Sequence, residues 1–113
     1  VRGAVAMTWP SRYEGFGLPI LEAMSLDTPV LSSDAGALPE VAGGAAHLLP
    51  VDDPDAWVEG MRQMLEDGEE RQRMIEAGHA RVTGFTWRHT ADCILDAYRR
   101  AAKNLPSDEE TVP

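Results

Sequence analysis

Residues 4–24, which read AVAMTWPSRYEGFGLPILEAM, decide the fold class. Ala4 to Trp9 form an apolar run that Pro10 ends, and such a run predicts a buried parallel strand. Pro19 suits the first turn of a helix. The apolar positions of that helix are Ile20, Leu21, Ala23 and Met24. The segment therefore predicts a strand that leads through a loop, residues 11–17, into a helix.

The same order of elements continues after residues 27–29, Asp-Thr-Pro, which end the helix. The expected elements are a strand at Val30–Ser33, a loop at Asp34–Gly36, a helical turn at Leu38–Val41, a breaker at Gly43–Gly44 and a strand at Ala46–Leu49. Short connections between alternating strands and helices imply right-handed crossovers and a parallel sheet. We therefore expect an α/β fold: half of a Rossmann-like domain, with three parallel strands and flanking helices.

The rest of the chain predicts a C-terminal helical segment. Asp53 can cap a helix that has Pro54 at its first position and that Gly68 stops. Its expected core stripe is Trp57, Val58, Met61, Met64 and Leu65. A second helix is expected over Glu69–Val82, with its pattern interrupted at Gly78, and a third after the Thr86 cap to about Asn104. The apolar side of the third helix comprises Trp87, Ala91, Ile94, Leu95, Tyr98 and Ala102. Residues 1–104 are expected to form one domain, and residues 105–113 an acidic disordered tail.

Composition excludes several classes of function. The 113 residues suit one domain, and no apolar run reaches the ~20 residues of a membrane span. A formal net charge of −9 argues against nucleic acid and anionic membrane as partners, so any phosphate must be held by local groups. The single cysteine, Cys93, cannot form an internal disulfide, which suits a reducing, cytoplasmic compartment.

The loop after the first strand is the candidate binding site, because ligands of open α/β sheets bind where strands end. Gly15 and Gly17 allow a sharp bend, and the helix that begins near Leu18 presents backbone N–H groups to an anion. An ordinary strand-to-helix turn explains the two glycines equally well. Glu14 and Glu22 bracket this site, and two carboxylates beside a diphosphate can accept hydrogen bonds from a sugar and a ribose.

At these residues the sequence resembles the retaining glycosyltransferases of group 1, also called family 4, whose signature is two glutamates separated by seven residues. The resemblance runs from PSRYEGFGLPILEAM, residues 10–24, through Thr28-Pro29-Val30 and GALPEV, residues 36–41, to Phe85-Thr86-Trp87. It covers nearly all of the chain except the acidic tail.

The resemblance implies the donor-binding C-terminal part of an enzyme with two Rossmann-like domains. Glu14 would contact hydroxyls of the transferred sugar as a catalytic residue, without a nucleophile role, and Glu22 would contact the ribose. The donor-binding loop also includes Gly15, and the amides of Phe16, Gly17 and Leu18 would serve the sugar and the diphosphate. The nucleotide-sugar donor is a substrate, and neither a cofactor nor a bound metal is expected.

The family's N-terminal acceptor domain and the first strands of the donor domain have no counterpart in this sequence, so the chain alone is expected to be inactive. Arg12 is the only basic residue near the loop. Alternatives are a nucleotide-sugar epimerase or phosphorylase fragment, or a non-catalytic self-associating module. The outer edge of the first strand is expected to lack a partner strand, which predicts a homo-oligomer.

Other residue types that often carry function have simpler explanations here. His47, His79 and His89 share no metal-ligand spacing. Core packing explains the three tryptophans, at positions 9, 57 and 87, better than sugar stacking. Glu40 suits a helix N-terminus, and turn chemistry explains Asp34.

Overall fold

The computed structural model describes residues 1–13 and 15–103, so the expected tail lies outside the described residues. The chain forms two compact units, Val1–Thr83 and Gly84–Pro113, and each is described by itself. The first unit contains a parallel sheet in the order β1-β2-β3. Its strands are β1 (Met7–Trp9), β2 (Val30–Ser33) and β3 (His47–Leu49). The predicted α/β fold, half of a Rossmann-like domain, is therefore confirmed.

The central strand β2 is buried along its whole length, whereas β1 is not. In the register, Met7 lies beside Val30, and Leu31 lies beside His47. The prediction of a buried strand over Ala4–Trp9 was wrong: β1 has three residues, Thr8 is exposed, and its neighbours in β1 are half-buried. The reason is position, because β1 is an edge strand of the described sheet and β2 lies between two strands.

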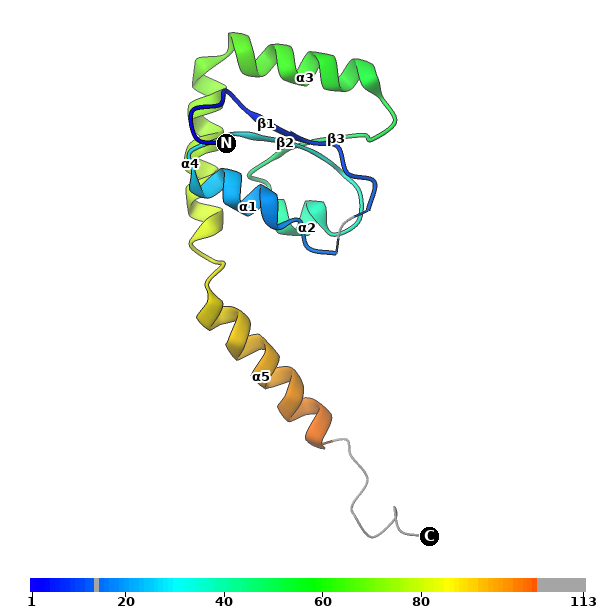
Figure 1. Ribbon diagram of the computed structural model, residues 1–113, viewed down its shortest axis with the longest axis vertical. Coiled ribbons are helices and arrows are strands. Elements are labelled where there is room, and N and C mark those ends of the chain that lie inside the picture. Colours follow the sequence, from blue (N-terminus) through cyan, green and yellow to red (C-terminus); the bar gives the residue numbers. More distant parts are fainter. Residues whose placement is uncertain (14, 104–113) are drawn as a thin grey trace. The chain divides into compact units, whose positions relative to one another are not determined.

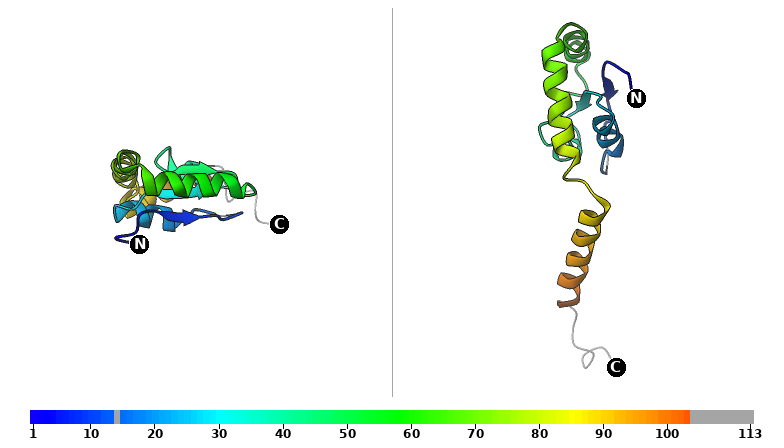
Figure 2. Two further views of the ribbon diagram at one scale, coloured as in Figure 1. Left: turned by 90° about the horizontal axis from the view of Figure 1, so that it is seen from above. Right: turned by 90° about the vertical axis from the view of Figure 1, so that its left-hand side faces the viewer.

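Helices cover both faces of this sheet, as Figures 1 and 2 show. The helices α1 (Leu18–Ser25) and α2 (Leu38–Ala42) lie on one face, and α3 (Pro54–Glu66) lies on the other. The fourth helix, α4 (Gly68–Val82), contacts both α1 and α3. It therefore connects the two helical layers.

The helix α1 buries one face and ends at a left-handed residue. Its buried residues are Ile20, Leu21, Ala23 and Met24, as the sequence pattern predicts. The N–H groups of Leu26 and Thr28 both donate to the carbonyl of Ala23, at 3.0 Å. Asp27 lies between them at φ 59°, in the region that usually favours glycine after a helix. The chain thus turns back into β2.

The helix α3 corrects the predicted core stripe. Asp53 caps α3 by accepting a hydrogen bond from the Ala56 N–H at 3.1 Å, as predicted. Trp57, Gly60 and Met64 are the buried residues, spaced three and four apart, and Gly60 allows the backbone to approach Leu49 and Leu31 of the sheet. Val58, Met61 and Leu65, by contrast, are exposed. The apolar stripe predicted for α3 therefore extends beyond the narrower face of this helix that packs on the sheet.

The boundary between α3 and α4 lies at Asp67 and not at Gly68. Asp67 ends α3 and also caps α4, because its carboxylate accepts a hydrogen bond from the Glu70 N–H at 3.0 Å. Gly68, predicted to stop α3, is the first residue of α4. The helix continues through Gly78, where a Cβ atom would lie 3.1 Å from Met24 Cγ. Gly78 therefore permits close packing of α4 on α1.

The second unit contains α5 (Trp87–Lys103). Thr86 caps it as predicted, accepting a hydrogen bond from the His89 N–H at 3.0 Å. None of the residues of α5 is buried, and Trp87 is 86% exposed. Core packing of Trp87 and of the apolar side of this helix stays a prediction, because the second unit is described by itself.

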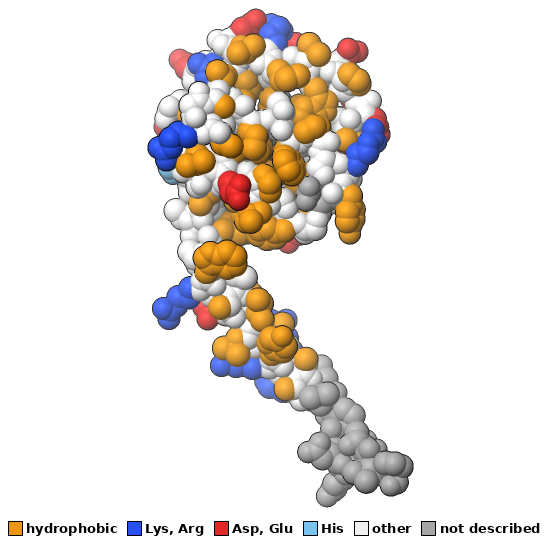
Figure 3. All heavy atoms as spheres, viewed as in Figure 1, with side chains coloured by type: hydrophobic (Ala, Val, Ile, Leu, Met, Phe, Trp, Pro, Cys, Tyr) orange, Lys and Arg blue, Asp and Glu red, His pale blue; other side chains and the backbone are white. Residues whose placement is uncertain are grey.

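The face of the first unit in Figure 3 has β1 at the front, and hydrophobic side chains gather on it. Val5 and Val58 are among the exposed hydrophobic residues of this unit. Among the described strands, β1 pairs with β2 alone. Self-association through this edge stays a prediction. No helix in the part of the chain that the structure describes is long and apolar enough to cross a membrane.

Adjacent residues of α3 test which face stabilises the fold. Met64 is 1% exposed and Leu65 is 68% exposed. We expect Met64→Ala to lower the free energy of unfolding by about 2–5 kcal/mol, because it leaves a cavity against the sheet. Leu65→Ala, the matched control, should change it by less than about 0.5 kcal/mol. Urea unfolding of both variants measures the difference, and equal losses would show that α3 does not pack as described.

Candidate functional site

Three loops meet at the carboxyl edge of the parallel sheet. The buried Ser33 hydroxyl at the end of β2 donates a hydrogen bond to the Ser11 carbonyl in the loop after β1. The Asp34 N–H after β2 donates to the Leu49 carbonyl at the end of β3, at 3.0 Å. Arg12 forms an ion pair with Asp52 at 2.7 Å, which links the loops after β1 and β3. In open α/β sheets this edge is where ligands bind.

Gly17 makes the sharp turn from the first of these loops into α1. Its backbone lies at φ 80° and ψ 42°, in the left-handed region, and it occupies the N-cap position of α1. The Ile20 N–H donates to the Gly17 carbonyl at 3.1 Å. A Cβ atom on Gly17 would lie 2.7 Å from Leu38 Cδ2, well inside contact distance. Both the backbone conformation and the space available therefore require glycine here.

Gly15 plays a different part from Gly17. A Cβ atom placed on Gly15 would meet nothing within 4 Å among the described residues. The backbone at Gly15 therefore has no side chain and lies beside open space. The structure describes the sharp bend at Gly17, and a bend at Gly15 stays a prediction.

The N-cap residue of α1, Gly17, has no side chain with which to cap the helix. Pro19, in the first turn, has no N–H to satisfy. The side chains of Phe16 and Leu18 are about half exposed, at 48% and 49%. A helix N-terminus of this kind attracts negative charge through its aligned peptide dipoles. The arrangement can thus accept an anion at the carboxyl edge.

The structure describes one of the two glutamates of the predicted site. Glu22 lies on α1 and is exposed, on the side opposite the buried Ile20 and Met24. Its carboxylate is therefore available to accept hydrogen bonds from outside the protein. Glu14 lies outside the described residues, so its distance from Glu22 is not described.

Sequence reasoning did not identify the residues of neighbouring elements that hold this loop in place. Leu38 fills the space beside Gly17, and Ser33 fixes the loop at Ser11. A serine at the end of a strand and a leucine beside a proline are common for many reasons. The only signal was their place at the ends of successive elements, which also indicates an ordinary fold.

The structure also describes four other residues that the sequence analysis considered. Arg12 is paired with Asp52, and both side chains are 72% exposed, so their attraction is weak. Glu40 lies in the first turn of α2, and Asp34 is exposed. His79 contacts Asp27, far along the chain from the loop.

Two of the three tryptophans lie in the first unit. Trp57 is buried and its indole N–H donates to the Pro50 carbonyl at 2.8 Å, so core packing is confirmed for it. Trp9 is half-buried at the end of β1. Its buried indole nitrogen has no hydrogen-bond partner among the described residues.

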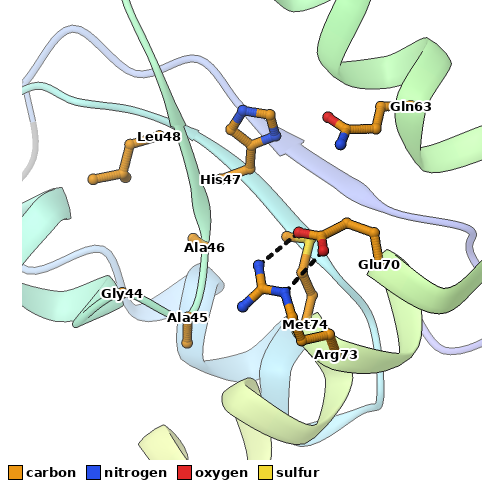
Figure 4. A pocket seen from close by; sticks show the side chains of 9 residues that line it. All are labelled: Gly44, Ala45, Ala46, His47, Leu48, Gln63, Glu70, Arg73 and Met74. Atoms are coloured by element: carbon orange, nitrogen blue, oxygen red, sulfur yellow. Dashed lines mark hydrogen bonds and ion pairs between the residues drawn. The ribbon is translucent and has the colours of Figure 1, made fainter. Parts of the chain in front are cut away.

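A hollow of about 450 Å³ lies elsewhere in this unit, between β3, α3 and α4. Figure 4 shows His47, Gln63 and the Glu70–Arg73 ion pair around it, with Arg73 Nη2 2.6 Å from Glu70 Oε1. The hydrogen bond from Arg73 lowers the pKa of Glu70. None of the predicted donor residues that the structure describes lines this hollow. Within residues 1–13 and 15–103, no three His, Cys, Asp or Glu side chains are placed to hold a metal ion.

The fold and the loop define the class of domain. It is half of a Rossmann-like domain in which a turn at glycine leads from the carboxyl edge of the sheet into a helix. The sequence model of the family described as Glycosyl transferases group 1 matches residues 1–81. The chain belongs to this family. The match ends near the boundary of the first compact unit, which covers Val1–Thr83.

Individual relatives agree with this assignment. O-antigen chain mannosyltransferase B of Escherichia coli is 40% identical over 96 residues, which cover 85% of this chain and 25% of that protein. D-inositol 3-phosphate glycosyltransferase of Kineococcus radiotolerans is 33% identical over 122 residues, covering 99% of this chain and 28% of that one. The solved structure of sucrose-phosphate synthase from Thermosynechococcus elongatus matches with a TM-score of 0.76 and 30% identity, over 90% of this chain and 26% of that chain. The chain thus spans about a quarter of the length of these relatives.

Substitution of the two loop glycines tests the turn. We expect Gly17→Ala to lower the free energy of unfolding by at least about 1–3 kcal/mol, the cost of holding a non-glycine residue in the left-handed region, with the Leu38 contact adding to it. Gly15→Ala is the matched control and should change stability by less than about 0.5 kcal/mol. Guanidinium unfolding measures both, and a Gly17→Ala variant as stable as Gly15→Ala would contradict the described turn.

Proposed function

We propose that this chain forms the donor side of a retaining glycosyltransferase that takes a sugar from a nucleotide-sugar. One observation carries the proposal: Gly17 turns the backbone at the carboxyl edge of the sheet into the N-terminus of α1. Membership of the glycosyltransferase family supports the reaction class. The length of the relatives supports the further proposal that the acceptor is bound by other parts of a longer enzyme, and that the chain alone does not catalyse transfer.

The diphosphate of the donor is proposed to bind at the start of α1. The backbone N–H groups of Phe16, Gly17 and Leu18 would donate to its oxygens. Each charge-assisted bond contributes about 1.5–3 kcal/mol, and the helix dipole adds about 0.3–1 kcal/mol. The open space beside Gly15 supports this placement, because a ligand can approach the bare backbone there. Local binding of this kind also suits a chain of net charge −9, whose long-range field repels anions.

The two glutamates are proposed to recognise the hydroxyl groups on either side of the diphosphate. Glu22, exposed on α1, would accept hydrogen bonds from the ribose. Glu14 would accept hydrogen bonds from the transferred sugar and stabilise the positive charge that develops at its anomeric carbon. In the transfer, the bond from the anomeric carbon to the diphosphate oxygen breaks, and a bond to the acceptor oxygen forms on the same face while the acceptor hydroxyl gives its proton to the departing diphosphate. The diphosphate leaves with the electron pair, and the helix N-terminus stabilises its charge.

The ribose role of Glu22 predicts a uniform loss of nucleotide affinity. Glu22→Ala should weaken binding of both the nucleotide-sugar and the free nucleoside diphosphate about ten- to hundredfold, since a lost charged hydrogen bond costs about 1.5–3 kcal/mol. Calorimetric titration of the full-length enzyme with UDP, GDP and ADP, and of this chain in parallel, measures the effect. Glu76→Ala, another exposed glutamate on α4, is the control and should leave affinity unchanged. Equal affinities of Glu22→Ala and wild type would exclude the ribose role.

The role of Glu14 predicts a loss of rate more than of affinity. Glu14→Gln keeps the shape of the side chain and removes its charge, so turnover by the full-length enzyme should fall by about a hundredfold or more. Binding of the free nucleoside diphosphate should stay within about threefold of wild type, because the contact is to the sugar. Steady-state kinetics and titration of the same preparation separate the two quantities. Turnover within a few fold of wild type would show that Glu14 does not stabilise charge in the transition state.

A further inference from the structure

Arg81 connects α4 to the C-terminal turn of α2. Its Nε donates to the Val41 carbonyl at 2.9 Å, and its Nη2 donates to the Glu40 carbonyl at 2.6 Å. A Cβ atom on Gly43 would lie 2.4 Å from Arg81 Nε, so the guanidinium fills the space that glycine leaves. Gly43 also takes the left-handed conformation, at φ 56°, that ends α2. The glycine that ends α2 thus leaves the space that the guanidinium of Arg81 occupies.

The contact with Arg81 stabilises α2, which is too short to be stable without contacts to other elements. It has five residues, fewer than an isolated helix needs to be stable in water. The last carbonyls of a helix have no partner within it, and a cation at this end also interacts favourably with the helix dipole. Arg81 supplies both the donors and the charge. The position of α2 therefore depends on its contacts with other elements.

The other end of α2 supports the candidate site. Leu38, the first residue of α2, is fully buried. Its Cδ2 occupies the space where a Cβ atom of Gly17 would be. Gly17 is the N-cap of α1, so the side chain of Leu38 limits where the first turn of α1 can lie. A continuous series of contacts runs from Arg81 through α2 to the loop.

The helix α4 also contacts α1 directly, one turn before Arg81. At Gly78 the backbone of α4 comes within contact distance of Met24, near the C-terminal end of α1. α4 therefore fixes the far end of α1 through Gly78 and, through Arg81 and α2, supports its near end. Both ends of the helix that begins at the candidate site depend on one face of α4.

We infer that Arg81 is a positioning residue for the donor site: it fixes α2, which holds Leu38 against Gly17 and so orients the first amides of α1. Arg81 acts through Leu38 and Gly17 and does not contact the ligand. The effect on nucleotide binding rests on the proposed function, whereas the effect on the loop does not.

Hydrogen exchange tests the inference on the chain itself. In Arg81→Met, amides of residues 16–22 and 38–45 should exchange on the order of tenfold faster, whereas amides of the central strand, residues 30–33, should be unchanged. Arg81→Lys keeps the charge but not the forked pair of donors, so it should restore part of the protection. The matched control is Arg73→Met on the same helix, whose side chain pairs with Glu70 and should leave both segments unchanged.

The outcomes separate this inference from the proposed function. Faster exchange at residues 16–22 in Arg81→Met, with partial recovery in Arg81→Lys, supports the positioning role. Unchanged exchange there overturns it, and so does equal loss of protection in residues 30–33, which would indicate general unfolding. If Arg81→Met does not fold, Arg81→Lys against Arg73→Lys decides by the same criterion. Titration of the variants with UDP, GDP and ADP is the second readout: no binding by any form, wild type included, contradicts the proposed function and leaves the exchange result to decide the positioning.

Discussion

The close contact between Gly17 and Leu38 is the constraint on which the candidate site depends. The chain leaves β1 at the carboxyl edge of the sheet and must turn into α1 while α2 lies directly beside the turn. Only a residue without a Cβ atom meets both demands, because the backbone is left-handed and Leu38 occupies the adjoining space. The direction of α1 follows from this turn. Its apolar side then faces the interior and Glu22 faces outward.

The short helix α2 transmits this constraint to the rest of the unit. It is held at one end by the packing of Leu38 and at the other by hydrogen bonds from Arg81. Contacts at one end alone would not fix the position of α2, because five helical residues form too few internal hydrogen bonds. The helix α4 serves as the common support, since it contacts α1 at Gly78 and α2 at Arg81. The contacts of this loop thus continue, through α1 and α2, to residues about sixty positions along the chain.

Electrostatics explain why the backbone, and not basic side chains, is the proposed ligand for phosphate. The chain carries a net charge of −9, and Arg12, the basic residue beside the loop, is paired with Asp52. Peptide N–H groups at a helix start offer partial positive charge in a fixed direction, which ordinary side-chain motion does not weaken. The family to which the chain belongs transfers sugars, and the chain spans about a quarter of its relatives' length.

The sequence by itself determined the order of the elements, the parallel sheet and the caps at Asp53 and Thr86. These depend on local rules: apolar period, proline and glycine positions, and side chains that reach the nearest backbone N–H. Only the tertiary structure decided which residues of the apolar stripe of α3 are buried. Met64 and Leu65 look alike in the pattern, but one faces the sheet and the other does not. The same holds for Gly17, because the side chain of Leu38 that approaches it belongs to an element more than twenty residues away. Burial and close contact are properties of pairs of elements, and a pattern within one element cannot specify its partner.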